Sequence, residues 1–88
     1  MTLTFANNTP IEIAMPTTDD FSAPPSFLLQ VDGGTLAVER KRLSGAWQAI
    51  DGSPFSSGAM KILTVRSHSP NLRYTAESSA VEADIERL

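Results

Sequence analysis

The chain has 88 residues and a formal charge of −3, and 41% of its residues are hydrophobic. A chain of this length holds one domain, which excludes a multidomain enzyme. It contains no cysteine, which excludes a disulfide framework and thiolate metal sites, the usual supports of small domains. We therefore expect a thin hydrophobic core that gains stability by homo-oligomerisation, as a dimer or trimer.

Residues 1–25 differ in composition from the rest of the chain. They hold four of the six prolines and three acidic residues, with no lysine, arginine or glycine. Because proline cannot donate a ladder hydrogen bond, we expect an extended acidic N-terminal arm, with edge strands at Leu3–Phe5 or Ile11–Met15 as the alternative. An apolar side chain on such an arm is suited to a partner's groove, unless it packs back onto its own domain. The candidate partner-interface residues are Phe5, Ile11, Ile13 and Phe21.

Residues 26–50 predict consecutive strands, because apolar residues alternate with polar ones between turn-forming residues. Phe27, Leu29 and Val31 share one face, and the turn residues 32–34 predict a hairpin to a strand through Leu36 and Val38. A second turn at residues 44–45 leads to a return strand over residues 46–50. These patterns predict a meander of three strands.

The remaining residues add further strands. Residues 59–66 are apolar on both faces, which indicates a central strand, and residues 72–75 form the next one. Residues 79–88 fit either a capped helix or a strand; we favour the strand because Glu82 and Glu86 would repel each other on a helix. The sequence therefore predicts an all-β fold, a small antiparallel β-sandwich or barrel of about six to seven strands over residues 26–88.

We predict no catalytic, cofactor or metal site. His68 is the one histidine and lies in a turn-like Ser-His-Ser-Pro segment, without a nucleophile-elbow motif elsewhere. The sequence matches neither zinc-ligand spacing, a calcium loop nor a phosphate-binding loop. The start of the chain lacks signal-peptide features, and its longest aliphatic or aromatic run, residues 27–29, is far shorter than a membrane helix. We expect a protein that is neither secreted nor membrane-spanning.

Charge is segregated along the chain. Residues 26–76 carry six basic and three acidic side chains, whereas the flanking segments are net acidic. The basic run Arg40–Arg42 is short, strand alternation places only two of its cations on one face, and the pI is near 4.9, so nucleic-acid binding is not expected. We hypothesise that the basic middle pairs with the acidic arm or tail of a neighbouring copy.

Several positions between residues 26 and 86 together resemble a known group of proteins. They follow a strand, a glycine turn, a Val-Glu-Arg strand, a Gly-x-Trp hairpin and a late Arg-x-Tyr strand. The matching residues are Gly34, Val38, Glu39, Arg40, Gly45, Trp47, Gly58, Arg73 and Tyr74. In this pattern the chain resembles small β-sandwich virion proteins of tailed bacteriophages.

This resemblance implies a non-enzymatic structural protein of the virion, made in the host cytoplasm. It implies a capsid cement or decoration protein that binds the major capsid protein and stabilises the phage head. A tail, adaptor or fibre accessory that binds other virion proteins is the alternative within the same group.

Two rivals come from other classes. One is a glycan- or receptor-binding module in which Trp47 and Tyr74 are exposed on one surface, although a lone tryptophan in a small sandwich is more often part of the core. The other is a small hydrolase that uses His68.

Overall fold

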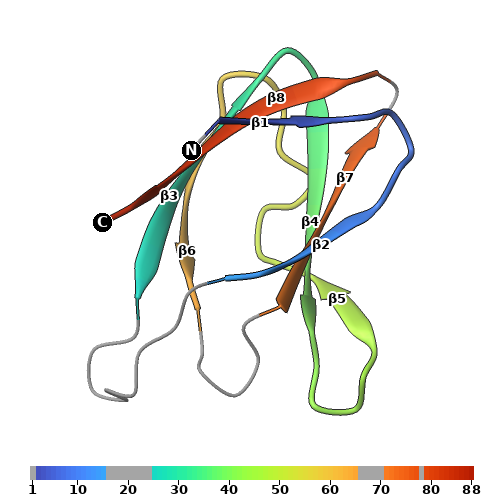
Figure 1. The fold of residues 1–88 in the computed structure, drawn as a ribbon, viewed down its shortest axis with the longest axis vertical. Coiled ribbons are helices and arrows are strands. Elements are labelled where there is room, and N and C mark those ends of the chain that lie inside the picture. The colour runs from blue at the N-terminus through green and yellow to red at the C-terminus, as the bar shows by residue number, and fades with distance from the viewer. Residues whose placement is uncertain (1, 16–24, 66–70, 78) are drawn as a thin grey trace.

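The computed structural model describes residues 2–15, 25–65, 71–77 and 79–88, and these residues form eight strands and no helix (Figure 1). Within this part of the chain no helix is long and apolar enough to cross a membrane. The strands are β1 (Thr2–Phe5), β2 (Ile11–Ala14), β3 (Ser26–Asp32), β4 (Thr35–Lys41), β5 (Trp47–Ala49), β6 (Met60–Thr64), β7 (Asn71–Glu77) and β8 (Val81–Arg87).

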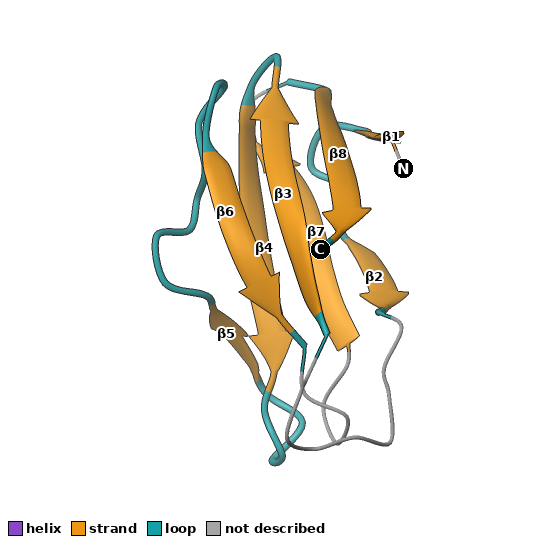
Figure 2. Ribbon diagram, turned by 90° about the vertical axis from the view of Figure 1, so that its left-hand side faces the viewer, coloured by secondary structure: helices purple, strands orange, loops and turns teal. Residues whose placement is uncertain are grey.

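The strands form two antiparallel sheets that face each other (Figure 2). One sheet has the order β1-β8-β3-β6 and the other β2-β7-β4-β5. The chain therefore pairs its strands in a nested way, first with last and inward to β4 with β5, and distributes the pairs alternately between the sheets. This order is that of an eight-stranded jelly roll. The predicted all-β sandwich is confirmed.

The core lies between the sheets and follows the period-2 pattern of the sequence. In β3 and β7 every second residue is buried, and β4 and β8 keep this alternation as far as Val38 and Ile85, as the sequence predicts. The described residues place no polar or charged side chain among the buried group. The core residues are Phe5, Met15, Phe27, Leu29, Val31, Leu36, Val38, Phe55, Leu63, Val65, Leu72, Tyr74, Ala76, Val81, Ala83 and Ile85.

The connection between β3 and β4 corrects the predicted hairpin and three-stranded meander. β3 and β4 lie in different sheets, and only the β4–β5 part of the meander is a hairpin. The turn is tight, with Gly33 at φ +83°, and a Cβ on Gly34 would lie 2.8 Å from the Val81 side chain. Both strands bury one apolar face, so a crossover lets each cover the other, whereas pairing would leave the two faces side by side.

Strand β6 is at the edge of its sheet and not at the centre, as its apolar residues had suggested. It pairs with β3 alone. Leu63 faces the core, but Met60 and Ile62 on the other face are 65% and 59% exposed. A two-sided apolar strand indicates burial only when a second layer covers it, and nothing in the described residues covers this face.

Residues 2–15 belong to the sandwich, which corrects the expected boundary between an arm at 1–25 and a domain at 26–88. β1 pairs with β8, β2 pairs with β7, and Phe5 is 1% exposed. Proline had argued against strands here, but Pro10 lies between β1 and β2 and so interrupts neither ladder. Both strands are edge strands, which is the alternative that the sequence had left open.

The C-terminal segment confirms the strand interpretation. β8 buries Val81, Ala83 and Ile85 and turns its acidic residues outward. It lies between β1 and β3, so it is an inner strand of its sheet.

Candidate partner interface

The sandwich has two open sides, where edge strands of the two sheets face each other. We call them the β1/β2 side and the β5/β6 side, after those strands. On the β1/β2 side the gap is filled by apolar side chains. The rings of Phe5 and Tyr74 are stacked with centroids 5.4 Å apart, and the Tyr74 hydroxyl donates to Sδ of Met15 at 3.5 Å. Burial raises the pKa of the Tyr74 phenol above its ordinary value of 10.0.

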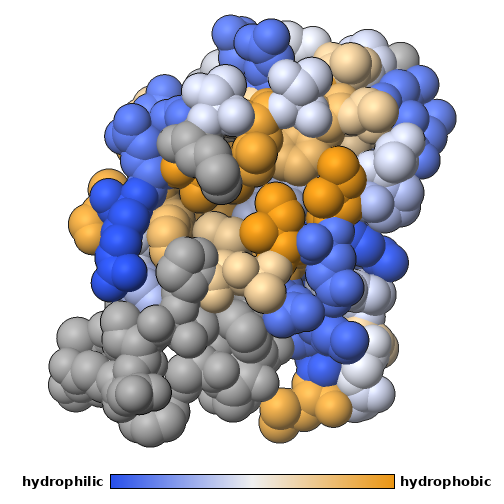
Figure 3. All heavy atoms as spheres, viewed as in Figure 1, coloured by the Kyte–Doolittle hydropathy of each residue, from blue (hydrophilic) through white to orange (hydrophobic). Residues whose placement is uncertain are grey.

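The candidate interface residues of the N-terminal segment are not grouped on an extended arm. Phe5 is in the core, where it cannot anchor a partner. Ile11 and Ile13 face the interior, opposite Tyr74 and Leu72, and remain half-buried because β2 is an edge strand. Figure 3 shows hydrophobic surface over β1 and β2 on this side, bordered by hydrophilic residues. A partner contact of Ile11 and Ile13 stays a prediction, and Phe21 lies outside the described residues.

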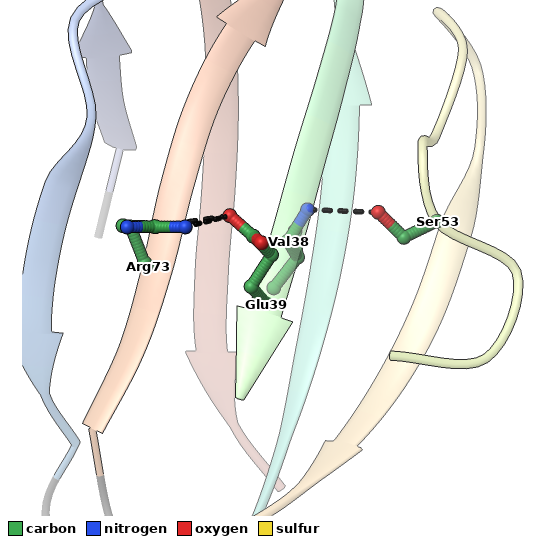
Figure 4. Close-up of polar contacts among 4 residues, drawn as sticks. All are labelled: Val38, Glu39, Ser53 and Arg73. Atoms are coloured by element: carbon green, nitrogen blue, oxygen red, sulfur yellow. Dashed lines mark hydrogen bonds and ion pairs between the residues drawn. The ribbon is translucent and has the colours of Figure 1, made fainter. Parts of the chain in front are cut away.

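Half of the β5/β6 side is closed by residues 50–59, which pass from one sheet to the other (Figure 2). Ser53 Oγ accepts a hydrogen bond from the Val38 N–H at 2.9 Å (Figure 4), and Phe55 exchanges two backbone hydrogen bonds with Leu36. Further along, Gly58 and Ala59 bond to Val31 of β3. This segment therefore covers the edge of β4 from Leu36 to Val38. Its Phe55 side chain is buried and closes the core at this point.

The other half of the β5/β6 side is an open cleft of about 760 Å³. Its walls are the end of β4 with the turn that follows, β5 with residues 50–51, and most of β6. Four of the lining residues are cationic and one is acidic, but the Lys41 side chain points to the outer face of the second sheet, with Nζ 5.8 Å from the Trp47 ring centroid. The lining residues are Arg40, Lys41, Arg42, Leu43, Ser44, Gln48, Ala49, Ile50, Asp51, Lys61, Ile62, Leu63 and Thr64.

Some backbone N–H and C=O groups of β6 point away from β3, toward the open side. The Val65 N–H donates to Pro25 O, and Ala59 O accepts from Val31, both at 3.0 Å, so the odd-numbered residues face β3. Because N–H and C=O alternate sides along an antiparallel strand, the even-numbered residues face outward. Arg40 Nη2 donates across the cleft to Thr64 O at 2.6 Å, which agrees with this direction. The N–H and C=O of Ile62 thus lie on an unpaired sheet edge.

Exposed apolar side chains lie close to the cationic residues of the cleft. Ile62 lines the cleft, Met60 follows it on the outer face of β6, and Leu43 in the β4–β5 turn is 85% exposed. An unpaired strand edge flanked by exposed apolar residues is a typical site for addition of a strand. Sequence reasoning missed this site because a strand's place in its sheet is not visible in its residue pattern.

Trp47 lies on the outer face of the second sheet and not in the core. It is opposite Lys41 in the β4–β5 pair, and the guanidinium of Arg73 lies 4.7 Å from its ring centroid. Arg73 in turn forms an ion pair with Glu39 at 2.7 Å (Figure 4). Tyr74 is fully buried, so the two aromatic residues do not share an exposed surface. The platform proposed for a glycan-binding module is therefore not formed.

The charge segregation of the sequence becomes spatial in the fold. Glu82, Asp84 and Glu86 point outward from β8, and Asp32 lies opposite Glu82 on β3. These carboxylates lie on the outer face of the first sheet, away from the basic cleft. The described part of the chain contains no cluster of three or more side chains that could hold a metal ion. His68 lies outside the described residues.

Comparison of the chain with protein-family models, with curated proteins and with solved structures gave no match.

Proposed function

We propose that this chain is a structural subunit that works by docking onto a larger protein assembly, and that it is a cement or decoration protein of a phage capsid. The observation that carries the docking role is the β5/β6 cleft. There an unpaired strand edge, exposed apolar side chains and the cations of Arg40, Arg42 and Lys61 lie together on one side of the sandwich. An interface of this kind joins a directional hydrogen-bonding edge to apolar contact and charge steering.

The assignment to a virion has two supports, the sequence resemblance given above and the jelly-roll strand order. Jelly rolls are used by viral capsid proteins, and also by lectins and cupins. This second support is an analogy at the level of the fold, because one fold serves many functions. The glycan-binding alternative gains nothing from the buried position of Tyr74.

Purified particles of the phage that carries this gene test the proposal. Quantitative gels and immunoblots should find the protein in the virion, in numbers comparable with the major capsid protein. Particles lacking the protein should lose thermal stability and regain it when purified protein is added, because binding stabilises the bound state by mass action. A copy number of only a few would indicate a tail or adaptor location. Absence from the particle would overturn the proposal.

A further inference from the structure

We infer that the β5/β6 cleft binds an acidic protein segment in extended conformation, which adds to β6 as a fifth strand of the first sheet. This inference names the partner chemistry of the docking site and rests on the proposed function.

The backbone of β6 leaves two hydrogen-bonding groups open for a partner. Ile62 presents an N–H and a C=O to the open side, and neither has a partner in the sheet. An extended segment laid along β6 would satisfy both groups, as in other cases of strand addition. Arg40 already satisfies Thr64 O, so the free stretch is centred on Ile62.

The two faces of the added strand would meet different surroundings. Side chains of a strand alternate between faces, so one set would lie beside Met60 and Ile62 and the other set would point into the cleft. The outer set meets apolar surface, and the inner set meets Lys61, Arg40 and Arg42. The fitting segment therefore alternates apolar residues with carboxylates.

The cations of the cleft disfavour a second copy that pairs edge to edge. Two β6 strands joined across a twofold axis would bring two sets of Lys61 and Arg42 close together. Like charges that face each other across an interface cost affinity, so the cations act against self-pairing and in favour of an acidic partner.

A peptide with the sequence of residues 80–88, capped at both ends, is a suitable probe. It alternates Val81, Ala83 and Ile85 with three carboxylates. Labelled peptide is titrated with the full chain and binding is followed by fluorescence anisotropy. The control is the same peptide with lysine at the three acidic positions, which should bind at least about tenfold more weakly.

Three variants locate the binding. Ile62→Pro removes the outward N–H without touching the ladder to β3, since proline is tolerated where the N–H of an edge strand faces solvent. Lys61→Glu reverses a cleft charge, and Arg87→Glu makes the same change on β8, outside the cleft. We expect the first two to weaken binding about tenfold or more, and Arg87→Glu to change it by less than about twofold.

Equal binding of the two peptides, or equal effects of Lys61→Glu and Arg87→Glu, would overturn the inference. So would binding of a single-stranded oligonucleotide in place of the acidic peptide, or a dimer that Ile62→Pro abolishes. If Ile62→Pro fails to fold, the charge variants and the two peptides still decide. Virions that contain the protein, and still bind the Lys61→Glu variant, would leave the proposed function standing while this inference fails. Peptide binding by a protein absent from virions would show the reverse.

Discussion

The two sides of the sandwich close the same kind of gap with different chemistry. On the β1/β2 side, Phe5, Tyr74 and Met15 fill the space between edge strands that do not pair. On the β5/β6 side, residues 50–59 seal one half, and the other half is lined by cations and an unpaired strand edge. Apolar side chains close a sandwich without pairing its edges, whereas charged ones keep the space hydrated. The closed side thus supplies stability, and the open side is the one that we propose as the recognition site.

The largest expected difference between the sides comes from Phe5→Ala. Phe5 is 1% exposed and stacks on Tyr74, so its truncation leaves a cavity. We expect the free energy of unfolding to fall by about 3–5 kcal/mol, measured by urea denaturation. The control is Leu43→Ala on the open side, where an 85% exposed side chain should cost less than about 0.5 kcal/mol. A Phe5→Ala protein as stable as the control would restore the interpretation of residues 1–25 as an arm.

The second prediction concerns alkaline pH and the β1/β2 side. Burial raises the pKa of Tyr74, so the folded protein keeps a proton that the unfolded chain releases above about pH 10. The contribution of the neutral phenol to the free energy of unfolding is therefore fully present below that pH. Above it the free energy of unfolding falls by about 1.4 kcal/mol for each pH unit.

Tyr74 is the one tyrosine of the chain, so phenolate absorbance reports it alone. We expect the absorbance to rise together with unfolding, as followed by circular dichroism. The Tyr74→Phe variant should lack this contribution to the pH dependence. A phenolate that forms near pH 10 in the folded protein would contradict the buried position of the ring.

The third prediction tests the sealed half of the β5/β6 side. Ser53→Ala removes the acceptor of the Val38 N–H, which has no strand beside it at that point. We expect a loss of about 1 kcal/mol and faster hydrogen exchange of the Val38 amide, because a partly buried donor loses its partner. Ser44→Ala in the exposed β4–β5 turn is the control and should change neither quantity measurably. Unchanged exchange at Val38 would show that residues 50–59 do not seal this edge.

The sequence predicted individual strands better than their neighbours. Alternation of apolar and polar residues located β3, β4, β7 and β8 and their buried faces, because each strand buries one face and the period is local. It could not show that β3 and β4 lie in different sheets, since a glycine turn is compatible with a hairpin or a crossover. The prediction of Phe5 as an interface residue failed for a related reason. An apolar residue on a short strand next to a proline gives the same sequence pattern whether it packs into a partner's groove or into the core of its own domain.

The candidate site was still less predictable. Arg40, Lys41 and Arg42 are adjacent in the sequence, but Lys61 joins them only because β5 and β6 face each other as unpaired edges. The exposure of Met60 and Ile62 likewise depends on which strand ends the sheet. The interpretation of Trp47 as a core residue failed because its apolar surface is covered by Arg73 and not by the other sheet.

The smallest expected effect belongs to Ile62→Thr on the open side. The side chain is 59% exposed, and threonine keeps both the β-branched shape and the edge N–H. We expect unfolding free energy to change by less than about 0.5 kcal/mol in thermal denaturation. A larger loss would show that Ile62 packs on its own domain and contributes to stability more than to recognition.

The nested strand pairing has a consequence for how the chain folds. Only the β4–β5 pair is joined by a short turn, and each pair outside it closes a longer loop, up to the contact of Thr2 with Asp84. Long loops cost more chain entropy and delay their contacts, so we infer that folding starts at the β4–β5 hairpin and proceeds outward. β1 must then wait until β8 has been synthesised before it finds its neighbour. During that interval Phe5 is exposed, and the same strand that completes the sandwich is the one most open to association with other chains.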